Sequence, residues 1–102
     1  MTNTNMQVAA TILAQLGGRQ FLAMTGAKNL LAGERELTMR LGSNATRTTH
    51  LRVALDASDT YTVNLLRVRG TTVRTLVTGE GIYADGLRGF VEEHTGLRTR
   101  LA

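Results

Sequence analysis

Apolar residues along the chain follow two different spacings, and the change of spacing divides the chain into elements. From Met6 to Leu16 they recur three and four positions apart, with Val8 and Ile12 on the same side as Leu16. This spacing predicts an amphipathic helix that packs on a flat surface. Thr4 or Asn5 is a suitable N-cap for this helix, and the glycine pair 17–18 is a suitable stop.

The middle of the chain has apolar residues at every second position, which is typical of half-buried strands. The alternation is cleanest at 36–41 and 50–55, and it resumes at 60–65 after the polar connection 56–59. Shorter strands are predicted at 21–25, 29–32 and 73–78. The intervening turns and loops are predicted at 26–28, 33–34, 42–46 and 79–81, where glycine and small polar residues gather.

The alternation changes phase inside one of these strands. The apolar positions are odd-numbered up to Leu65 and even-numbered from Leu66 onwards, opposite Arg67 and Arg69. A slip of one residue sends the alternate set of side chains to the other face, so we expect a bulge near Leu65-Leu66. Whether Arg67 and Arg69 share a face with Arg52 depends on this bulge.

A second helical spacing begins near Tyr83. One stripe is formed by positions 83, 87, 90, 91 and 94, which predicts a helix with His94 on its apolar side. Gly86 and Gly89 lie within this segment, and each lowers helix stability by about 1 kcal/mol relative to alanine. Their small size would allow a close approach to the sheet. Thr95-Gly96 is the expected end of the helix.

The order of elements indicates the fold class. The strands lie between two helices and are joined by connections short enough for hairpins. We therefore expect a single α+β domain over residues 1–102, built in two layers. An antiparallel sheet of four to five strands would be flanked in sequence by an N-terminal and a C-terminal helix packed on one face. The other face would be left to solvent or to a partner.

Composition excludes several classes of function. The chain has no cysteine and only two histidines, so disulfides, thiol catalysis and cysteine-ligated zinc are ruled out, and no metal or cofactor is expected. No apolar run approaches the roughly 20 residues that cross a bilayer, so no membrane association is expected. The opening MTNTNMQ lacks the features of a secretory signal, which predicts a cytoplasmic protein.

The charge balance favours an anionic partner. The net charge is +4, and all but one of the twelve basic residues are arginine. The planar guanidinium suits phosphates and carboxylates alike, so nucleic acid and an acidic protein patch are both candidate partners. The alternative is a solvated surface on a protein from a GC-rich genome, in which arginine replaces lysine throughout.

The predicted strands supply the candidate binding residues. Rows of side chains on neighbouring strands stand about 4.8 Å apart, and such a row of arginines can follow a phosphate backbone. The candidates for nucleic-acid binding are Arg40, Arg52, Arg67, Arg69 and Arg74, with Lys28 from the glycine turn TGAKN. The alternative is that these cations are scattered and partly paired with carboxylates. Only Tyr61 is a candidate for base stacking, so contact with a duplex or a backbone is favoured over single-strand capture.

The sequence shows no catalytic signature. Glu92, Glu93 and His94 are adjacent, and adjacent residues on a helix do not face one another. His50 could touch phosphate, but no nucleophile and base surround it. Asp56 and Asp59 share one turn and fit turn formation better than cation binding. We therefore expect a protein that is not an enzyme.

Two passages of the chain carry distinctive motifs: LGG at 16–18, Phe21, MTGAKN at 24–29, YAD at 83–85, LR at 87–88 and TGL at 95–97. In these motifs the chain resembles a widespread group of small proteins encoded by bacteriophages, prophages and other mobile elements. Phe90-Val91 departs slightly from the order of large apolar residues in that group. The resemblance implies a phage or mobile-element origin and a bacterial cytoplasm, and it carries over no activity and no site residues.

These inferences lead to a ranked expectation of function. The first is a small phage-type nucleic-acid-binding accessory protein that contacts the phosphate backbone through sheet arginines. The alternatives are an interaction protein that docks on an acidic partner, as a host-takeover or anti-defence factor would, and a homo-oligomeric structural module that pairs through an exposed edge strand.

Overall fold

A computed structural model describes residues 4–99 of the chain. Helices α1 (Thr4–Leu16) and α2 (Gly18–Thr25) come first, followed by five strands, a 3₁₀ turn η1 (Ala84–Gly86) and helix α3 (Leu87–Thr95). The strands are β1 (Lys28–Gly33), β2 (Glu36–Arg40), β3 (His50–Leu55), β4 (Tyr61–Arg69) and β5 (Thr72–Ile82).

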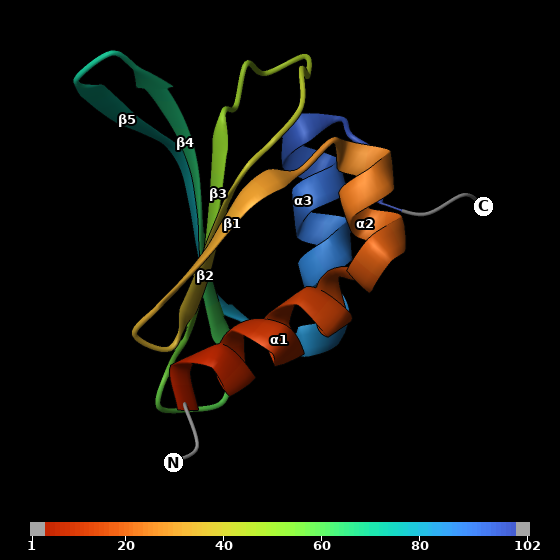
Figure 1. Cartoon of the computed structure of the whole chain (residues 1–102), viewed down its shortest axis with the longest axis vertical. Coiled ribbons are helices and arrows are strands. Elements are labelled where there is room, and N and C mark those ends of the chain that lie inside the picture. Colours follow the sequence, from red (N-terminus) through yellow and green to blue (C-terminus); the bar gives the residue numbers. More distant parts are fainter. Residues whose placement is uncertain (1–3, 100–102) are drawn as a thin grey trace.

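The five strands form one antiparallel meander in the order β1-β2-β3-β4-β5. Helices α1, α2 and α3 lie on the same side of this sheet, and no part of residues 4–99 forms a layer over the opposite side (Figure 1). The expected α+β fold, a two-layer arrangement with helices from both ends of the sequence on one face, is confirmed. The loop at 42–46 and the connection at 56–59 are also confirmed.

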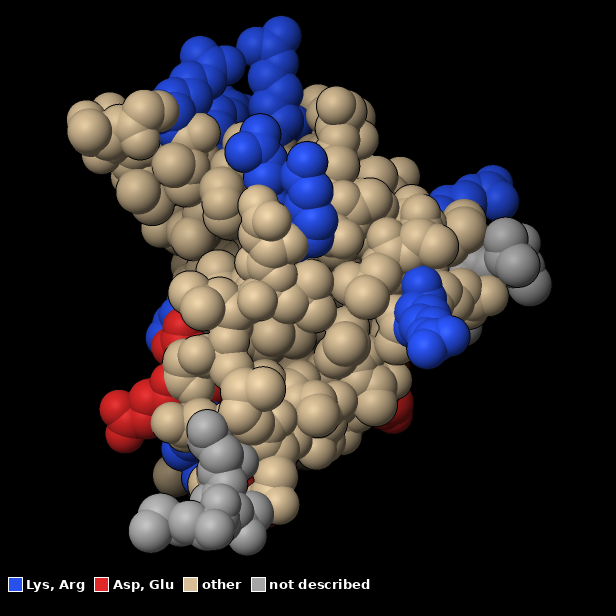
Figure 2. Space-filling model, viewed as in Figure 1, with Lys and Arg blue, Asp and Glu red and all other residues tan. Residues whose placement is uncertain are grey.

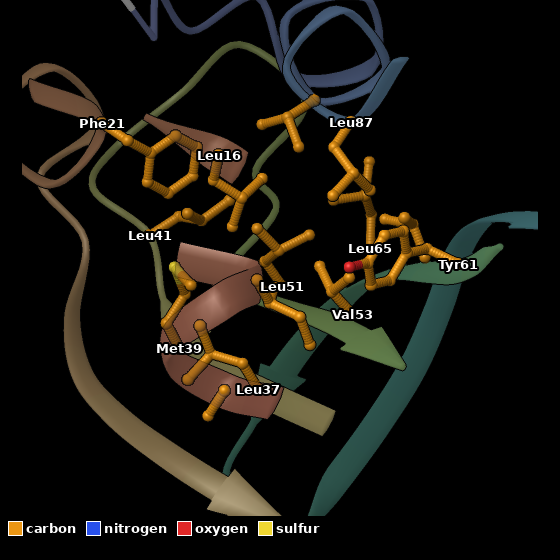
Figure 3. Close-up of a cluster of buried hydrophobic side chains, with 14 residues drawn as sticks. Leu16, Phe21, Leu37, Met39, Leu41, Leu51, Val53, Tyr61, Leu65 and Leu87 are labelled. Carbon is orange, nitrogen blue, oxygen red and sulfur yellow. The ribbon is translucent and has the colours of Figure 1, made fainter. Parts of the chain in front are cut away.

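The core lies between the helices and the middle of the strands. Leu37 and Met39 from β2 and Leu51 and Val53 from β3 point into it, as the alternation predicts. Figure 3 shows the helix side chains Leu16 and Phe21 close to Leu41, on one side of these sheet residues. The remaining core members come from α1, β4 and α3: Ala9, Ile12, Tyr61, Val63, Leu65, Leu87 and Val91.

The prediction of a strand at 21–25 is wrong, because this segment is the second half of α2. Phe21 and Thr25 are both buried and lie four positions apart, so they share one helical face. The helix ends at Gly26, which has the left-handed conformation (φ 67°) of a C-cap. A run of five apolar and small residues fits a buried strand or a buried helix turn equally well, so spacing alone could not distinguish them.

Both outer helices begin at different places from those expected. α1 already includes Thr4 and Asn5, and the Asn5 Oδ1 accepts a hydrogen bond from the backbone N–H of Arg35, 3.1 Å away in the β1–β2 turn. At the other end, Tyr83 precedes η1 and is 69% exposed, so it does not belong to the buried stripe. The expected stop at Gly96 is confirmed, with φ 76°.

A register shift between β4 and β5 lies at the expected place, Leu65-Leu66. Leu65 pairs with Val77 and Leu66 pairs with Thr75, so the extra residue is Leu76 and it belongs to β5. β4 itself stays in regular register with β3 up to Leu66. The segment at 79–81, predicted to close the sheet, instead continues β5, with a second irregularity near Gly81 (φ 65°).

Gly79 is required by close packing between β5 and α3. A Cβ atom at this position would lie 2.5 Å from Cε2 of Phe90 and 2.8 Å from Cδ1 of Ile82. Gly89, on α3, has no heavy atom within 4 Å of such a Cβ. The close approach to the sheet therefore depends on the glycine in the strand and not on Gly89.

These two glycines give a matched pair of substitutions. Gly79→Ala should lower the free energy of unfolding by about 1–3 kcal/mol, because the ring of Phe90 has to move. Gly89→Ala should raise it by about 0.5–1 kcal/mol, because it restricts the unfolded chain without a clash. Urea unfolding followed by circular dichroism measures both changes. A Gly79→Ala protein as stable as the parent would contradict the packing described.

Candidate nucleic-acid interface

The loop between β2 and β3, residues 41–49, is held by its own hydrogen bonds. Asn44 is at its centre, where Nδ2 donates to the carbonyls of Gly42 (2.9 Å) and Thr48 (2.7 Å) while Oδ1 accepts from the Thr48 N–H (3.0 Å). The Gly42 N–H donates to the carbonyl of Thr25 at the end of α2. A Cβ on Gly42 would lie 2.8 Å from that carbonyl oxygen, so a glycine is needed here. The loop therefore has a defined position over the end of the sheet.

Arg47 and Arg67 meet on this loop. Arg47 is exposed and has a left-handed backbone conformation (φ 58°). The Arg67 side chain, from β4, donates from Nη2 to the carbonyl of Thr46 (2.9 Å) and from Nε to the carbonyl of Arg47 (3.2 Å). These bonds hold the guanidinium of Arg67 in place, and their partners are neutral carbonyls, so its charge is not compensated.

Strand register brings further cations to the same end of the molecule. Arg67 is the cross-strand partner of Arg74, and Lys28 is the cross-strand partner of Arg40. We call this group the basic end, and its members are Lys28, Arg40, Arg47, Arg67, Arg69 and Arg74. Figure 2 shows basic side chains gathered where the β4–β5 hairpin and the 41–49 loop lie in Figure 1.

Two shallow hollows lie among these side chains. The larger, of about 260 Å³, has Arg40, Arg47, Arg67 and Arg69 in its lining together with Asn44 and Thr49. The smaller, of about 160 Å³, is lined by Arg67, Arg69, Thr72 and Arg74. Both are open to solvent, so an extended anion could contact several guanidinium groups at once.

The basic end contains no carboxylate. The sequence has no Asp or Glu from Leu37 to Leu55 or from Val63 to Gly79, the stretches that supply all of its arginines. Among the arginines and lysines of residues 4–99, the ion pair is Arg52–Glu36, which does not involve the basic end. The acidic residues of the strands and their turns lie instead at the opposite ends of the strands, at 34, 36, 56, 59 and 80, with Arg35 among them, and Asp85, Glu92 and Glu93 lie in η1 and α3. The sheet is thus polarised in charge along its strands.

The like charges at the basic end lie directly opposite one another. Cross-strand neighbours have Cβ atoms about 4.5–5.5 Å apart, and like charges in such pairs are destabilising. The pairs Arg67–Arg74 and Lys28–Arg40 both have this arrangement. The repulsion within these pairs lowers the stability of the folded state, so stability does not explain why the cations lie here.

Arg52 is not part of the basic end. It lies on the uncovered sheet face, where its Nε and Nη2 donate to the two carboxylate oxygens of Glu36 at 3.0 and 2.8 Å. Its Nη1 donates to Asn64, whose amide in turn donates to Thr78. These hydrogen bonds with Glu36 raise the pKa of Arg52. Arg52 stabilises the uncovered face across four strands, and Glu36 compensates its charge, so we do not count it in the basic end.

The expected rows of arginine on one face do not form. The uncovered face carries Arg40, His50 and Arg52, because these residues alternate along β2 and β3 with residues that are buried against the helices. Arg67 and Arg69 continue the side of β4 that carries Val63 and Leu65, beyond the part that the helices cover. Because the extra residue of the bulge is on β5, β4 keeps its phase, and Arg67 and Arg69 lie on the face opposite Arg52. The basic end is built around the sheet terminus and not on one face.

Sequence reasoning missed Arg47, because a loop residue has no periodic signal. Two features of the sequence could have pointed to Arg47. The stretch 37–55, which includes the loop, has no acidic residue, and the predicted hairpin places this loop at the same end of the sheet as residues 67–74.

The other candidate residues have structural roles. Asp56 accepts a hydrogen bond from the Thr62 hydroxyl (2.7 Å), and its carbonyl accepts from the Asp59 N–H. His94 is half-buried, with its ring centroid 4.4 Å from that of Phe90. Tyr61 is 4% exposed and donates to Gln15, so it offers no ring for stacking. In the described part of the chain no cluster of three or more His, Cys, Asp or Glu could hold a metal ion.

Comparison of the chain with protein-family models, with curated proteins and with solved structures yields no match. Among residues 4–99, no helix has the length and apolar character needed to cross a membrane.

His50 reports on the electrostatics of the basic end. Partial burial, followed by the charge of Arg40, lowers its pKa below the ordinary value of 6.5. We expect Arg40→Gln to raise the pKa of His50 and Arg69→Gln to change it little, as measured by NMR titration of the imidazole. Because the unfolded chain binds the proton more readily, His50 contributes stability that is lost as pH falls below about 6.5. An unchanged pKa in Arg40→Gln would contradict the placement of these two side chains.

Proposed function

We propose that this protein is a small nucleic-acid-binding accessory protein, of the phage type that its motifs resemble, and that it contacts the phosphate backbone through the basic end. The observation that carries the proposal is the group of six cations at one end of the sheet, without a carboxylate among them. Phosphates would remove the repulsion between these cations, which the fold alone leaves in place.

The side chains suit phosphate chemically. Five of the six cations are arginines, whose planar fork can donate two parallel hydrogen bonds to one phosphate. Arg67 is already held by two loop carbonyls, so less side-chain entropy is lost when it binds. Each phosphate that is neutralised releases condensed counterions, which favours binding at low salt.

The shape of the basic end favours a duplex. β3 pairs with β4 only as far as Leu66. Beyond Leu66, the end of β4 and the start of β5, from Arg67 to Arg74, pair only with each other and form a two-stranded ribbon. A ribbon of this width fits the major groove, which is about 12 Å wide. The ring most open to solvent, that of Tyr83, lies at the far end of β5 from the basic end. Single-strand binding by base stacking has no platform here.

A second candidate function is docking on an acidic protein. Val73 lies on the ribbon next to Arg74 and is 62% exposed. An exposed apolar side chain contributes to a protein interface and adds nothing to a phosphate contact. Carboxylates on such a partner would bind the same arginines.

Two double variants test the proposal at equal net charge. Arg69→Gln with Arg74→Gln removes two exposed cations from the basic end, whereas Arg19→Gln with Arg98→Gln removes two exposed cations elsewhere. We expect the first to weaken binding to a short duplex and to reduce the slope of log K against log salt by about 2, since each lost phosphate contact contributes about 0.9. The second should leave affinity and slope close to those of the parent.

The controls separate binding from folding and from the second candidate. Removal of Arg74 relieves a like-charge pair, so the first double variant should unfold at the same or a higher temperature than the parent. Equal duplex affinity in both double variants would refute the basic end as the site. A stoichiometric acidic protein that stays bound in nuclease-treated lysate, and is lost with Arg69→Gln/Arg74→Gln, would favour the docking function.

A further inference from the structure

The surface formed by α1 and β1 is almost free of charge. α1 contains no charged residue, and Met6, Ala10 and Ala14 follow one another at intervals of four on its exposed side. Met6 is 56% exposed, and it lines an apolar hollow of about 240 Å³ with Leu13 and Leu30. Figure 2 shows an uncharged area across the centre of the molecule, where α1 and β1 lie in Figure 1. For a chain with a net charge of +4 this is an unusual surface to leave to water.

β1 is an edge of the sheet, and beyond its one irregularity it has neither the charge nor the bulge that usually protects an edge. Leu31 is 68% exposed on the uncovered side, and residues 29–33 carry no charge. The other edge, β5, is interrupted by two irregularities and carries Arg74 and Glu80. Bulges and charges of this kind prevent strands from pairing with other chains. β1 has one irregularity, between Lys28 and Leu31, and then a regular uncharged stretch.

We propose that this surface binds a second copy of the same chain, with the two β1 strands antiparallel about a two-fold axis near Leu31. The two sheets would then be continuous, and the two α1 helices would lie side by side on the same face, burying Met6, Leu30 and Leu31. A two-fold interface brings the same patch of both copies together, which requires the patch to be complementary to itself.

The charges near β1 meet this requirement. Lys28 and Glu34 are exposed and lie three residues to either side of Leu31. In an antiparallel pair centred on Leu31, Lys28 of each copy faces Glu34 of the other, and the long lysine side chain can span the irregularity beside it. The basic end of one copy also comes next to the β1–β2 turn of the other, which contains Glu34 and Arg35, whereas a parallel arrangement would bring Lys28 of one copy next to Lys28 of the other. An acidic partner would be attracted to the basic end instead, since the cations next to β1 in sequence are Lys28 at its start and Arg35 after its end, and α1 has none.

Charge reversal tests the interface and its direction in the absence of nucleic acid. By light scattering after size exclusion, the parent should have about twice the chain mass of 11.0 kDa. Lys28→Glu alone and Glu34→Lys alone should each place like charges at both ends of the interface and weaken the dimer by about tenfold or more, which corresponds to the 1.4 kcal/mol of a tenfold change. An equimolar mixture of the two variants should form a heterodimer, because every facing pair is then of opposite charge.

Two further substitutions act as controls. Leu31→Arg should give a monomer with an unchanged circular dichroism spectrum, since the side chain is already exposed. Tyr83→Arg introduces the same charge at an equally exposed position directly after β5, the sheet edge opposite β1, and it should leave the dimer intact. A parent that is monomeric at several hundred micromolar would overturn the proposal. A parent dimer that survives Leu31→Arg, or a mixture of the two charge variants that stays monomeric, would also overturn it.

Discussion

The sheet is covered by helices on one face only, and this asymmetry determines where the chain can carry charge. The apolar side chains of β2, β3 and β4 meet those of α1, α2 and α3, with Leu16, Phe21 and Leu87 on the helix side (Figure 3). The uncovered face has no second layer, so its polar groups pair among themselves in the chain of hydrogen bonds from Glu36 through Arg52 and Asn64 to Thr78. Folding is stabilised at the middle of the strands. The two signs of charge are segregated at opposite ends of the strands.

The segregation has a cost that the fold does not explain. Opposite charges in cross-strand pairs contribute roughly 0.2–1 kcal/mol, and like charges oppose folding. The chain satisfies Arg52 with a carboxylate held by two hydrogen bonds, yet it leaves Arg67 opposite Arg74 and Lys28 opposite Arg40. The residue pattern, packing and charge of a sequence normally all favour the same fold, and positions where one of them disfavours it are expected at functional sites. This conflict at the basic end is the strongest physical reason to connect it with an anionic partner.

The strands and the layering could be predicted from the sequence, since alternation over 36–41 and 50–55 depends only on which face is buried. The helix at 21–25 could not, because a short apolar run fits either element until its neighbours are known. The position of the bulge was visible as a change of phase, but the extra residue is Leu76 on the partner strand, which only pairing can reveal. For the site, the register brings Arg40, Arg67 and Arg74 to one end of the sheet, as their positions at strand ends suggest, and their binding role stays a prediction. The pairing of Arg52 with Glu36 and the placement of Arg47 depend on contacts between segments distant in sequence.

The two proposed surfaces meet at Lys28, and the chemistry of that residue shows how they would coexist. It is the one lysine of the basic end, a compact and strongly hydrated charge, whereas the other five cations are arginines suited to phosphate. Pairing with Glu34 of a second copy would use Lys28 and leave all five arginines available. Because the strands of the two copies are antiparallel, their basic ends would point in opposite directions. The two basic ends of such a dimer could not bind side by side along one straight duplex. They would instead bind two separate segments of nucleic acid.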